Sequence, residues 1–246
     1  MHIVMFDSML EAGGAERVLV TMANNLVTRH DVTIVTFCKE AGDVFYEINS
    51  DVRMEYLNQL GASTGLLDAI RQNVRRILVL RESIRRIKPD IIISFLPENN
   101  VLVTLSCFGL KIPIVATEHT DPFGTKLGRA WDILRTCVYR RVDAIVVLNR
   151  LAKEYFVKRF NAPVIVIPNP IFLPAEKEEA EKLKFSSPYI ITIGRLVKNK
   201  RIEDVISAFS QLESEFKAWQ LIIVGDGPLK EELQGFANQL GVSERV

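Results

Sequence analysis

The chain has 246 residues, of which 48% are hydrophobic, and its 31 basic and 30 acidic side chains leave a formal net charge of +1. This hydrophobic content is ample for the core of one large or two modest domains. The balanced charge argues against a nucleic-acid partner, since such proteins present a strongly basic surface. No apolar run reaches the roughly 18 residues that a membrane span needs, and the N-terminus does not read as a signal peptide. We therefore expect a cytoplasmic protein.

Up to residue 168, short β-branched runs alternate with longer segments of helical period. This alternation predicts βαβ units, that is, an α/β fold with a parallel sheet covered by helices. The apolar run at residues 91–93 predicts a strand buried on both faces. The expected strands are residues 2–6, 32–37, 52–57, 90–95, 112–117, 144–147 and 164–167. The expected helices are residues 15–28, 66–88, 99–108, 128–140 and 149–159.

A proline-rich run and an acidic, lysine-rich stretch then interrupt the pattern. We expect an N-terminal domain over residues 1–168, a linker over 169–187 and the start of a second domain over 188–246. In the second domain we expect strands at 189–193 and 220–224 and helices at 203–212 and 229–240. Two strands and two helices cannot bury a doubly wound sheet on both faces, so we expect this domain to be incomplete at Val246.

The three cysteines, Cys38, Cys107 and Cys137, are far apart and have no Cys-x-x-Cys spacing or nearby histidine. Each lies in an apolar or amphipathic stretch, so we expect three buried free thiols. No metal-ligand spacing joins His2, His30 and His119 either. The sequence predicts no metal site.

Glycine-rich turns follow strands in both halves. Gly13 and Gly14 open a helix whose free N–H groups favour a phosphate, although a purely structural turn explains them equally well. Glu16 is interpreted as a first-turn carboxylate that offsets the helix dipole. In the second half, Arg195 and Lys200 follow a strand and can bind phosphate oxygens, or they are solvated surface cations.

His119 directly follows the expected fifth strand. Open α/β sheets bind ligands at the carboxyl ends of their strands, which favours a functional histidine. A structural or surface histidine is the alternative.

Five motifs occur in order: Gly13-Gly14-Ala15-Glu16, His119, 167–170 (Ile-Pro-Asn-Pro), 194–200 and 225–228 (Gly-Asp-Gly-Pro). In this order they resemble the retaining GT-B glycosyltransferases of family 4, over essentially the whole chain. The resemblance implies two Rossmann-like doubly wound parallel-sheet domains, the second incomplete. It also implies transfer of a hexose or N-acetylhexosamine from a nucleotide sugar, with UDP as the expected nucleotide, to a lipid-linked or polysaccharide acceptor with retention.

The resemblance also implies roles for single residues. Gly13 and Gly14 would meet the donor diphosphate, Arg195 and Lys200 would neutralise it, and His119 would lie beside the donor sugar. No metal or other cofactor is expected, because cationic side chains and amides stabilise the leaving group. Arg201 stands where the family usually has glycine.

The family's paired glutamates, seven residues apart, and its base-reading loop would lie beyond Val246. A non-catalytic remnant, or a module that binds nucleotide or glycan, therefore remains the alternative. A two-domain small-molecule-binding protein explains Arg195 and Lys200 less well.

The expected helix 66–88 is unusually basic. Ile70, Val74, Ile77, Ile84 and Ile87 recur at helical spacing and predict a buried stripe. The basic residues around it include Arg71, Arg75, Arg76, Arg85 and Arg86. They form either a solvated face or a surface that contacts anionic lipid or a pyrophosphate-linked acceptor. Family members with this Gly-Gly-Ala-Glu opening commonly build cell-surface polysaccharide or lipid-linked glycans, which implies cell-envelope biosynthesis and peripheral contact with the inner face of the cell membrane.

Overall fold

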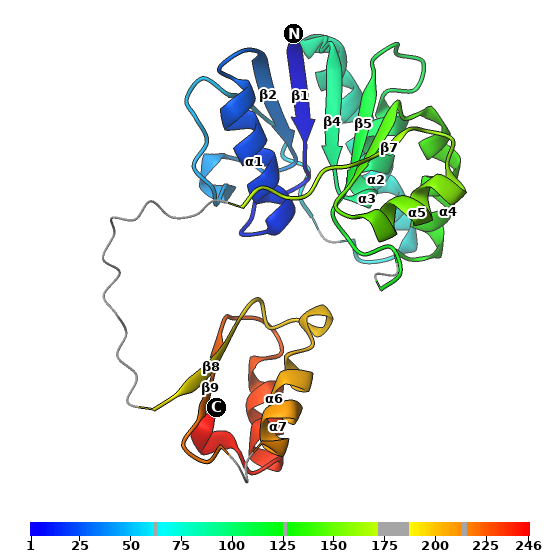
Figure 1. Cartoon of the computed structure of the whole chain (residues 1–246). Helices are drawn as coiled ribbons and strands as arrows, with labels where there is room; N and C mark the ends of the chain where they lie inside the picture. Colours follow the sequence, from blue (N-terminus) through cyan, green and yellow to red (C-terminus); the bar gives the residue numbers. More distant parts are fainter. Residues whose placement is uncertain (62, 125–126, 172–186, 213–215) are drawn as a thin grey trace. The chain divides into compact units, whose positions relative to one another are not determined.

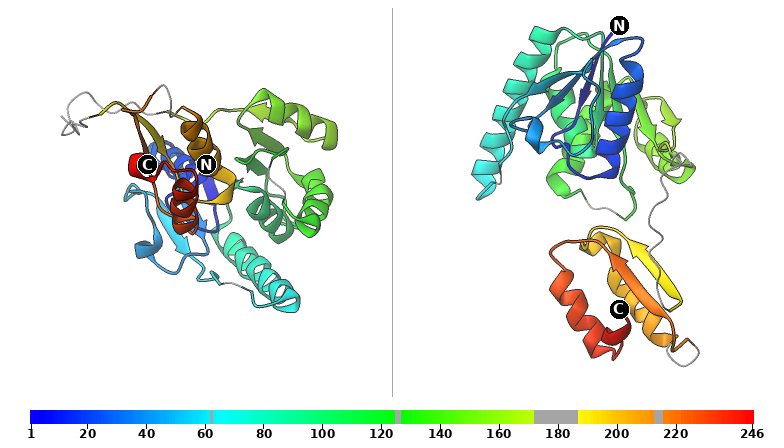
Figure 2. Two further views of the ribbon diagram at one scale, coloured as in Figure 1. Left: turned by 90° about the horizontal axis from the view of Figure 1, so that it is seen from below. Right: turned by 90° about the vertical axis from the view of Figure 1, so that its left-hand side faces the viewer.

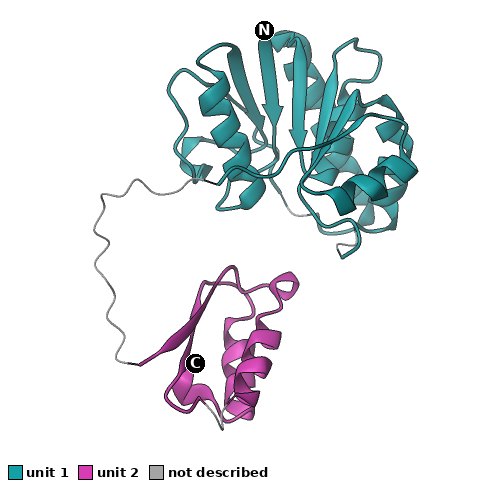
Figure 3. Ribbon diagram, in the orientation of Figure 1, with its two compact units in different colours: residues 1–172 teal, residues 173–246 magenta. Residues whose placement is uncertain are grey.

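The structure is a computed structural model that describes residues 1–61, 63–124, 127–171, 187–212 and 216–246. The chain divides into two compact units, residues 1–172 and residues 173–246 (Figures 1 and 3). Most of the expected linker, 169–187, lies outside the described residues.

Unit 1 is built on a seven-stranded parallel sheet with the order β3-β2-β1-β4-β5-β6-β7 (Figure 1). The strand order reverses between β1 and β4, which are hydrogen-bonded neighbours. The strands are β1 (His2–Phe6), β2 (Asp31–Thr36), β3 (Arg53–Tyr56), β4 (Ile91–Phe95), β5 (Ile114–Glu118), β6 (Ala144–Val147) and β7 (Val164–Val166).

The described helices of unit 1 are distributed unequally between the two faces of this sheet. They are α1 (Gly14–Leu26), α2 (Leu66–Ile87), α3 (Pro97–Ser106), α4 (Arg129–Val138) and α5 (Arg150–Arg159). Helix α1 packs on one face, in a core that includes Met5 and Ile34. Helices α2 to α5 pack on the other face, in a core that includes Phe6 and Ile92. The α/β class predicted from the alternating pattern is confirmed.

The α1 side of the sheet is poorly covered beyond β1. Side chains of a strand alternate between faces, and Ile93, Val115 and Val146 on this side are only half-buried. Ile92 and Ile145, which point to the other side, are fully buried. The prediction that residues 91–93 are buried on both faces is therefore wrong, because among the described helices only α1 packs on this face.

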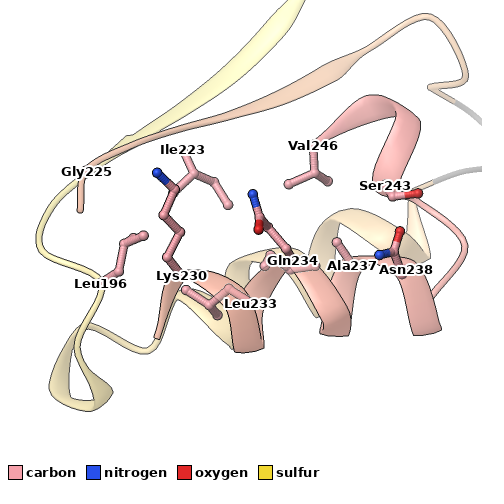
Figure 4. Close-up of a pocket in the computed structure, with 11 residues that line it drawn as sticks. Leu196, Ile223, Gly225, Lys230, Leu233, Gln234, Ala237, Asn238, Ser243 and Val246 are labelled. Carbon is pink, nitrogen blue, oxygen red and sulfur yellow. The ribbon is translucent and has the colours of Figure 1, made fainter. Parts of the chain in front are cut away.

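Unit 2 contains two parallel strands, β8 (Tyr189–Ile193) and β9 (Gln220–Val224), and two helices, α6 (Ile202–Gln211) and α7 (Lys230–Gln239). The helices enclose a small core with the sheet. Ile191 and Ile193 are exposed. A hollow of about 440 Å³ beside β9 and α7 is lined in part by Ile223, Leu233 and Ala237 (Figure 4). The sheet described for unit 2 is thus open, with apolar side chains facing outward.

The three cysteines of the chain are free thiols. Cys38 and Cys107 are buried free thiols as predicted, but Cys137 is exposed. The prediction for Cys137 is wrong because its side chain lies on the outer side of α4. The side chain of the next residue, Val138, packs in the core. Among the described residues, no helix combines the length and the apolar character that a membrane span requires.

Candidate functional site

The candidate residues of unit 1 lie at the carboxyl edge of its sheet. Gly13 and Gly14 follow β1, and His119 follows β5, with β4 lying between these two strands. Because all strands are parallel, these segments leave the sheet at the same edge. Ligands of open α/β sheets bind at this edge, at the point where the strand order reverses. The structure therefore brings the two sequence-predicted features of unit 1 to one ligand-facing edge.

Gly14 is the first residue of α1, and Gly13 is its N-cap in an extended conformation. The first amides of a helix have no intrahelical partner and can bind an anion. A Cβ on Gly13 would overlap the carboxylate of Glu16, whereas a Cβ on Gly14 would meet nothing within 4 Å. The carboxylate of Glu16 thus folds back over Gly13 at the positive end of the helix, in the first turn where the sequence predicts it.

His119 packs on Phe95, with the ring centroids 5.4 Å apart and the planes 23° from parallel. Burial lowers the pKa of His119 to about 4, so the imidazole is neutral at pH 7. Its Nδ1 atom has no hydrogen-bond partner among the described residues. His119 lines a groove of about 600 Å³ together with Val18, one turn after Gly14. A neutral imidazole at this position can donate one hydrogen bond and accept another.

Asp7 and Asn99 form a buried pair that sequence reasoning missed. Asp7 directly follows β1, and Asn99 lies in the first turn of α3. The Asn99 Nδ2 atom donates to Asp7 Oδ1 at 2.8 Å and to the Phe95 carbonyl at 2.9 Å. Burial, reinforced by the charge of Glu16, raises the pKa of Asp7 well above its usual range. The sequence did contain a signal for Asp7, because it is a polar residue directly after a buried strand. The same signal led to the prediction of His119.

Glu118, the last residue of β5, is the centre of a second buried network. The Tyr139 hydroxyl donates to Glu118 Oε1, and Asn100 Nδ2 donates to the Tyr139 hydroxyl at 2.9 Å. An Arg135 Nη1 atom lies 3.9 Å from Glu118 Oε2. Burial raises the pKa of Glu118 to about 7, against the opposing effects of Tyr139 and Arg135. This network holds the end of the strand that carries His119.

In unit 2 the two glycine-containing turns pack backbone to backbone. Gly194 N donates to the Val224 carbonyl at 3.0 Å, and Leu196 N donates to the Asp226 carbonyl at 2.8 Å. A Cβ on Gly225 would overlap the carbonyl oxygen of Gly194. The structure thus brings the 194–200 and 225–228 motifs together at the carboxyl ends of β8 and β9.

Arg195 and Lys200 lie on the first of these turns, and both are exposed. Within the described part of the chain, neither side chain makes a hydrogen bond or an ion pair. Their charges are therefore available to an anion.

Arg201 adopts a left-handed conformation, with φ 51° and ψ 43°, at the N-cap of α6. This region disfavours side chains with a Cβ by roughly 1–2 kcal/mol, which explains why glycine suits the position. The Nε atom of Arg201 lies 2.6 Å from Asp204 Oδ2, an exposed pair that offsets part of this cost.

The five arginines predicted to form a cationic surface on α2 divide into two groups. Arg76 donates to the carbonyls of Gln59 and Gly61, at 3.1 Å each, and Arg86 pairs with Glu55. Arg71, Arg75 and Arg85 are exposed and have no such partner among the described residues. Arg76 and Arg86 thus bind other parts of unit 1, and whether this side of α2 is a solvated face or contacts anionic lipid or acceptor stays a prediction.

The predicted buried stripe of α2 is also only partly correct. Ile84 is buried, and Ile77 and Ile87 pack against the core. Ile70 and Val74 are exposed. The prediction is wrong for these two residues because the first half of α2 extends past the core.

Comparisons with known proteins agree with this fold. Residues 12–173 match the model of Glycosyltransferase Family 4, and residues 175–246 match that of Glycosyl transferases group 1. The strand order and the helices on both faces of the sheet define unit 1 as an α/β protein of the doubly wound class. The chain belongs to the family 4 and group 1 glycosyltransferases.

One relative is a Campylobacter jejuni alpha-1,4-N-acetyl-D-galactosaminyltransferase, named for a GalNAc-containing glycan on undecaprenyl diphosphate. It is 32% identical over 98% of this chain, and the chain spans 66% of its length. A second Campylobacter jejuni N-acetylgalactosaminyltransferase is 25% identical over 96% of the chain, which again spans 66% of the relative.

Solved structures show the same fold. Anabaena HepE in complex with UDP-glucose superimposes with a TM-score of 0.70 at 17% identity, over 100% of this chain and 68% of that one. Sucrose-phosphate synthase from Thermosynechococcus elongatus gives 0.78 at 14% identity, over 100% and 69%. The GT-B fold that the sequence implies is thereby confirmed.

Proposed function

We propose that this protein transfers a hexose or N-acetylhexosamine from a UDP-sugar to a lipid-linked or polysaccharide acceptor, with retention of the anomeric configuration. The observation that carries the proposal is that the sheet of each unit has groups suited to a phosphate or a sugar at the carboxyl ends of its strands. In unit 1 the N-terminus of α1 and the neutral His119 lie at this edge, and in unit 2 Arg195 and Lys200 have no partner among the described residues. Membership of a glycosyltransferase family makes a nucleotide sugar the matching ligand.

Each residue then has a defined role. The turn at Gly13 and Gly14 meets the donor diphosphate, with the Gly14 amide as a donor, because the Gly13 amide already donates to the Glu11 carbonyl at 2.8 Å. Arg195 and Lys200 neutralise the charge of the diphosphate as the bond to the sugar breaks. His119 positions the donor sugar through a neutral hydrogen bond. The acceptor hydroxyl attacks the anomeric carbon from the same face from which the diphosphate departs, through an oxocarbenium-like transition state, and its proton passes to the departing diphosphate. No metal ion is required in this scheme, because amides and cationic side chains stabilise the leaving diphosphate.

Two comparisons support the choice of substrates. The 32%-identical relative is named for a GalNAc-containing acceptor on undecaprenyl diphosphate, and HepE was solved with UDP-glucose. We extend both to this chain and place it at the inner face of the cell membrane. The exposed Arg71, Arg75 and Arg85 would contact anionic lipid there.

Donor turnover tests the proposal. The chain is incubated with UDP-GlcNAc, UDP-GalNAc and UDP-glucose, and UDP release and donor affinity are measured with and without EDTA. Each of Arg195→Ala and Lys200→Ala should weaken donor binding by about tenfold or more, because charge-assisted hydrogen bonds contribute roughly 1.5–3 kcal/mol. Lys217→Ala, another exposed cation of unit 2, is the matched control. Unchanged affinity in both site variants would refute their role, and binding without turnover would favour a binding module.

Gly14→Ala separates a structural from a ligand-binding role for the first turn. The methyl group meets no protein atom within 4 Å, so the free energy of unfolding should not fall. It would stand where the diphosphate approaches the backbone, so we expect donor affinity to fall at least tenfold. If affinity and stability are both unchanged, the donor does not approach Gly14. The anomeric configuration of the product, read by NMR, tests retention.

A further inference from the structure

The start of α1 lacks the local contacts that usually fix the first turn of a helix. Gly13 is the N-cap and has no side chain that could accept from the first amides, as serine or aspartate would. Glycine also has more backbone freedom than other residues. The peptide unit between Gly13 and Gly14 is therefore held by contacts from elsewhere in unit 1 rather than by its own side chains.

The hydroxyl of Tyr46 provides one of these contacts. It donates to the Gly13 carbonyl oxygen at 3.0 Å, across 33 positions of the chain. The same oxygen accepts from Arg17 N at 3.1 Å. A carbonyl oxygen has two lone pairs, and here each accepts one hydrogen bond. Two donors from separate parts of the chain thus fix the plane of this peptide unit.

Tyr46 is itself held in place beside α1. It lies in the segment between β2 and β3, which is coloured light blue and runs next to α1 (Figures 1 and 2). Phe45 N donates to the Leu10 carbonyl at 2.8 Å, and Asn49 N donates to Asn24 Oδ1 at 2.9 Å. The ring of Tyr46 is half-buried and packs against the core between α1 and the sheet. The hydroxyl therefore approaches the turn from a fixed position.

The direction of the Gly14 N–H follows from this contact. A peptide unit is planar and trans, so its C=O and N–H groups point in opposite directions. The Gly13 carbonyl and the Gly14 N–H belong to one unit, and this N–H is the first amide of α1, without an intrahelical partner. A hydrogen bond to the carbonyl also polarises the unit, which makes the N–H a stronger donor. The Tyr46 hydroxyl thus acts on both the direction and the donor strength of this amide.

We propose that Tyr46 is a positioning residue, which orients the Gly14 N–H towards the diphosphate of the sugar donor. The inference rests on the proposed function, in which this amide meets the diphosphate. Tyr46 acts through the peptide unit of Gly13 and does not itself contact the donor. A purely structural tyrosine would affect stability alone, whereas a positioning residue affects the binding of the diphosphate.

The variant Tyr46→Phe tests the inference, because it removes the hydroxyl and keeps the ring. UDP is the probe, since it carries the diphosphate of the proposed donor. Calorimetric titration of the full chain should show a UDP affinity about fivefold weaker than that of the wild type, as expected for the loss of a hydrogen bond of roughly 1 kcal/mol. In amide NMR spectra of the free protein, the Gly14 amide proton should shift upfield. Tyr56→Phe, the matched control, removes a hydroxyl that has no hydrogen-bond partner among the described residues and should bind UDP as the wild type does.

A double-mutant cycle separates this inference from the proposed function. Gly14→Ala should weaken UDP binding by about tenfold or more, and adding Tyr46→Phe should weaken it by less than about twofold further, because both act on the same amide. If Gly14→Ala weakens UDP binding and Tyr46→Phe does not, the inference is wrong and the proposed function stands. An equal loss from Tyr46→Phe in both backgrounds would also overturn the inference, since Tyr46 would then act elsewhere. If Gly14→Ala leaves UDP binding unchanged, the proposed contact of the diphosphate with this turn is itself wrong, and the inference falls with it.

Discussion

Single residues at the carboxyl edge of unit 1 combine burial with unusual protonation. His119 is neutral at pH 7 because it is buried against Phe95. Asp7 follows β1, and Glu118 is the last residue of β5. Burial raises the pKa of both carboxyl groups. Perturbed pKa values of this kind gather at functional sites, although buried structural networks produce them as well. Asp7 is therefore a second candidate for contact with a ligand, beside His119.

Glu118 should make the stability of the protein depend on pH. Its pKa rises from 4.5 to about 7 on folding, so the unfolded carboxyl loses its proton first as the pH rises. The stabilisation is complete below pH 4.5 and is lost as the pH rises towards 7, by at most about 3 kcal/mol. The groups that face Glu118 are Tyr139, Arg135, Asn100 and Glu98.

The variant Glu118→Gln tests this effect. Its side chain is neutral at every pH and can still accept from Tyr139. The difference in free energy of unfolding between wild type and variant, measured by denaturant titration, should change steadily between pH 4.5 and 7. Taking this difference removes the opposite contribution of His119, whose pKa falls on folding. A difference that does not vary with pH would contradict the assignment.

At the scale of elements, side chains of α2 form hydrogen bonds with the loop that precedes the helix. Two arginines of α2 differ in their contacts. Arg76 donates to the carbonyls of Gln59 and Gly61, and its guanidinium lies 5.7 Å from the ring centre of Phe37. Arg71 is exposed. The helix is thus held by its polar side, which leaves its apolar side outward.

Arg76→Gln should lower the free energy of unfolding by about 1–2 kcal/mol, because two backbone carbonyls lose a charged donor. Arg71→Gln, the matched control on the same helix, should change it by less than about 0.5 kcal/mol. Urea denaturation of the two variants measures both values. Equal effects would show that the contacts of Arg76 contribute nothing to stability.

At the scale of the whole molecule, the two units differ in how well each buries its own sheet. Unit 1 has seven paired strands and two cores of its own. The described sheet of unit 2 has two strands and one small core with α6 and α7, so it buries less apolar surface than unit 1.

A fragment of residues 1–172 should therefore fold alone, with a melting temperature within a few degrees of the main transition of the full chain. A fragment of residues 187–246 should melt at a lower temperature and without a sharp transition. Circular dichroism during heating measures both. An unfolded 1–172 fragment would show that unit 1 depends on unit 2.

The sequence alone determined the elements, their order and the positions of the candidate site. Strand β1 was predicted with its observed bounds, and Asn149, predicted to begin a helix, caps α5 by accepting from Ala152 N at 2.8 Å. Local periodicity and capping chemistry decide such features. Gly13, His119 and Arg195 were selected from the sequence because each follows a predicted strand. Residues that follow the parallel strands of a sheet lie at its carboxyl edge, where ligands bind.

Only the tertiary structure decided which of these side chains are free and which are bound. Helical spacing places Arg71 and Arg76 alike on the surface of α2, and the loop at Gln59 and Gly61 separates them. Ile70 and Ile84 share a period, but the core reaches only Ile84. The buried Asp7–Asn99 pair joins residues 92 positions apart. Contacts between distant segments set burial, and burial sets pKa values and the availability of charges, so local sequence patterns could not predict them.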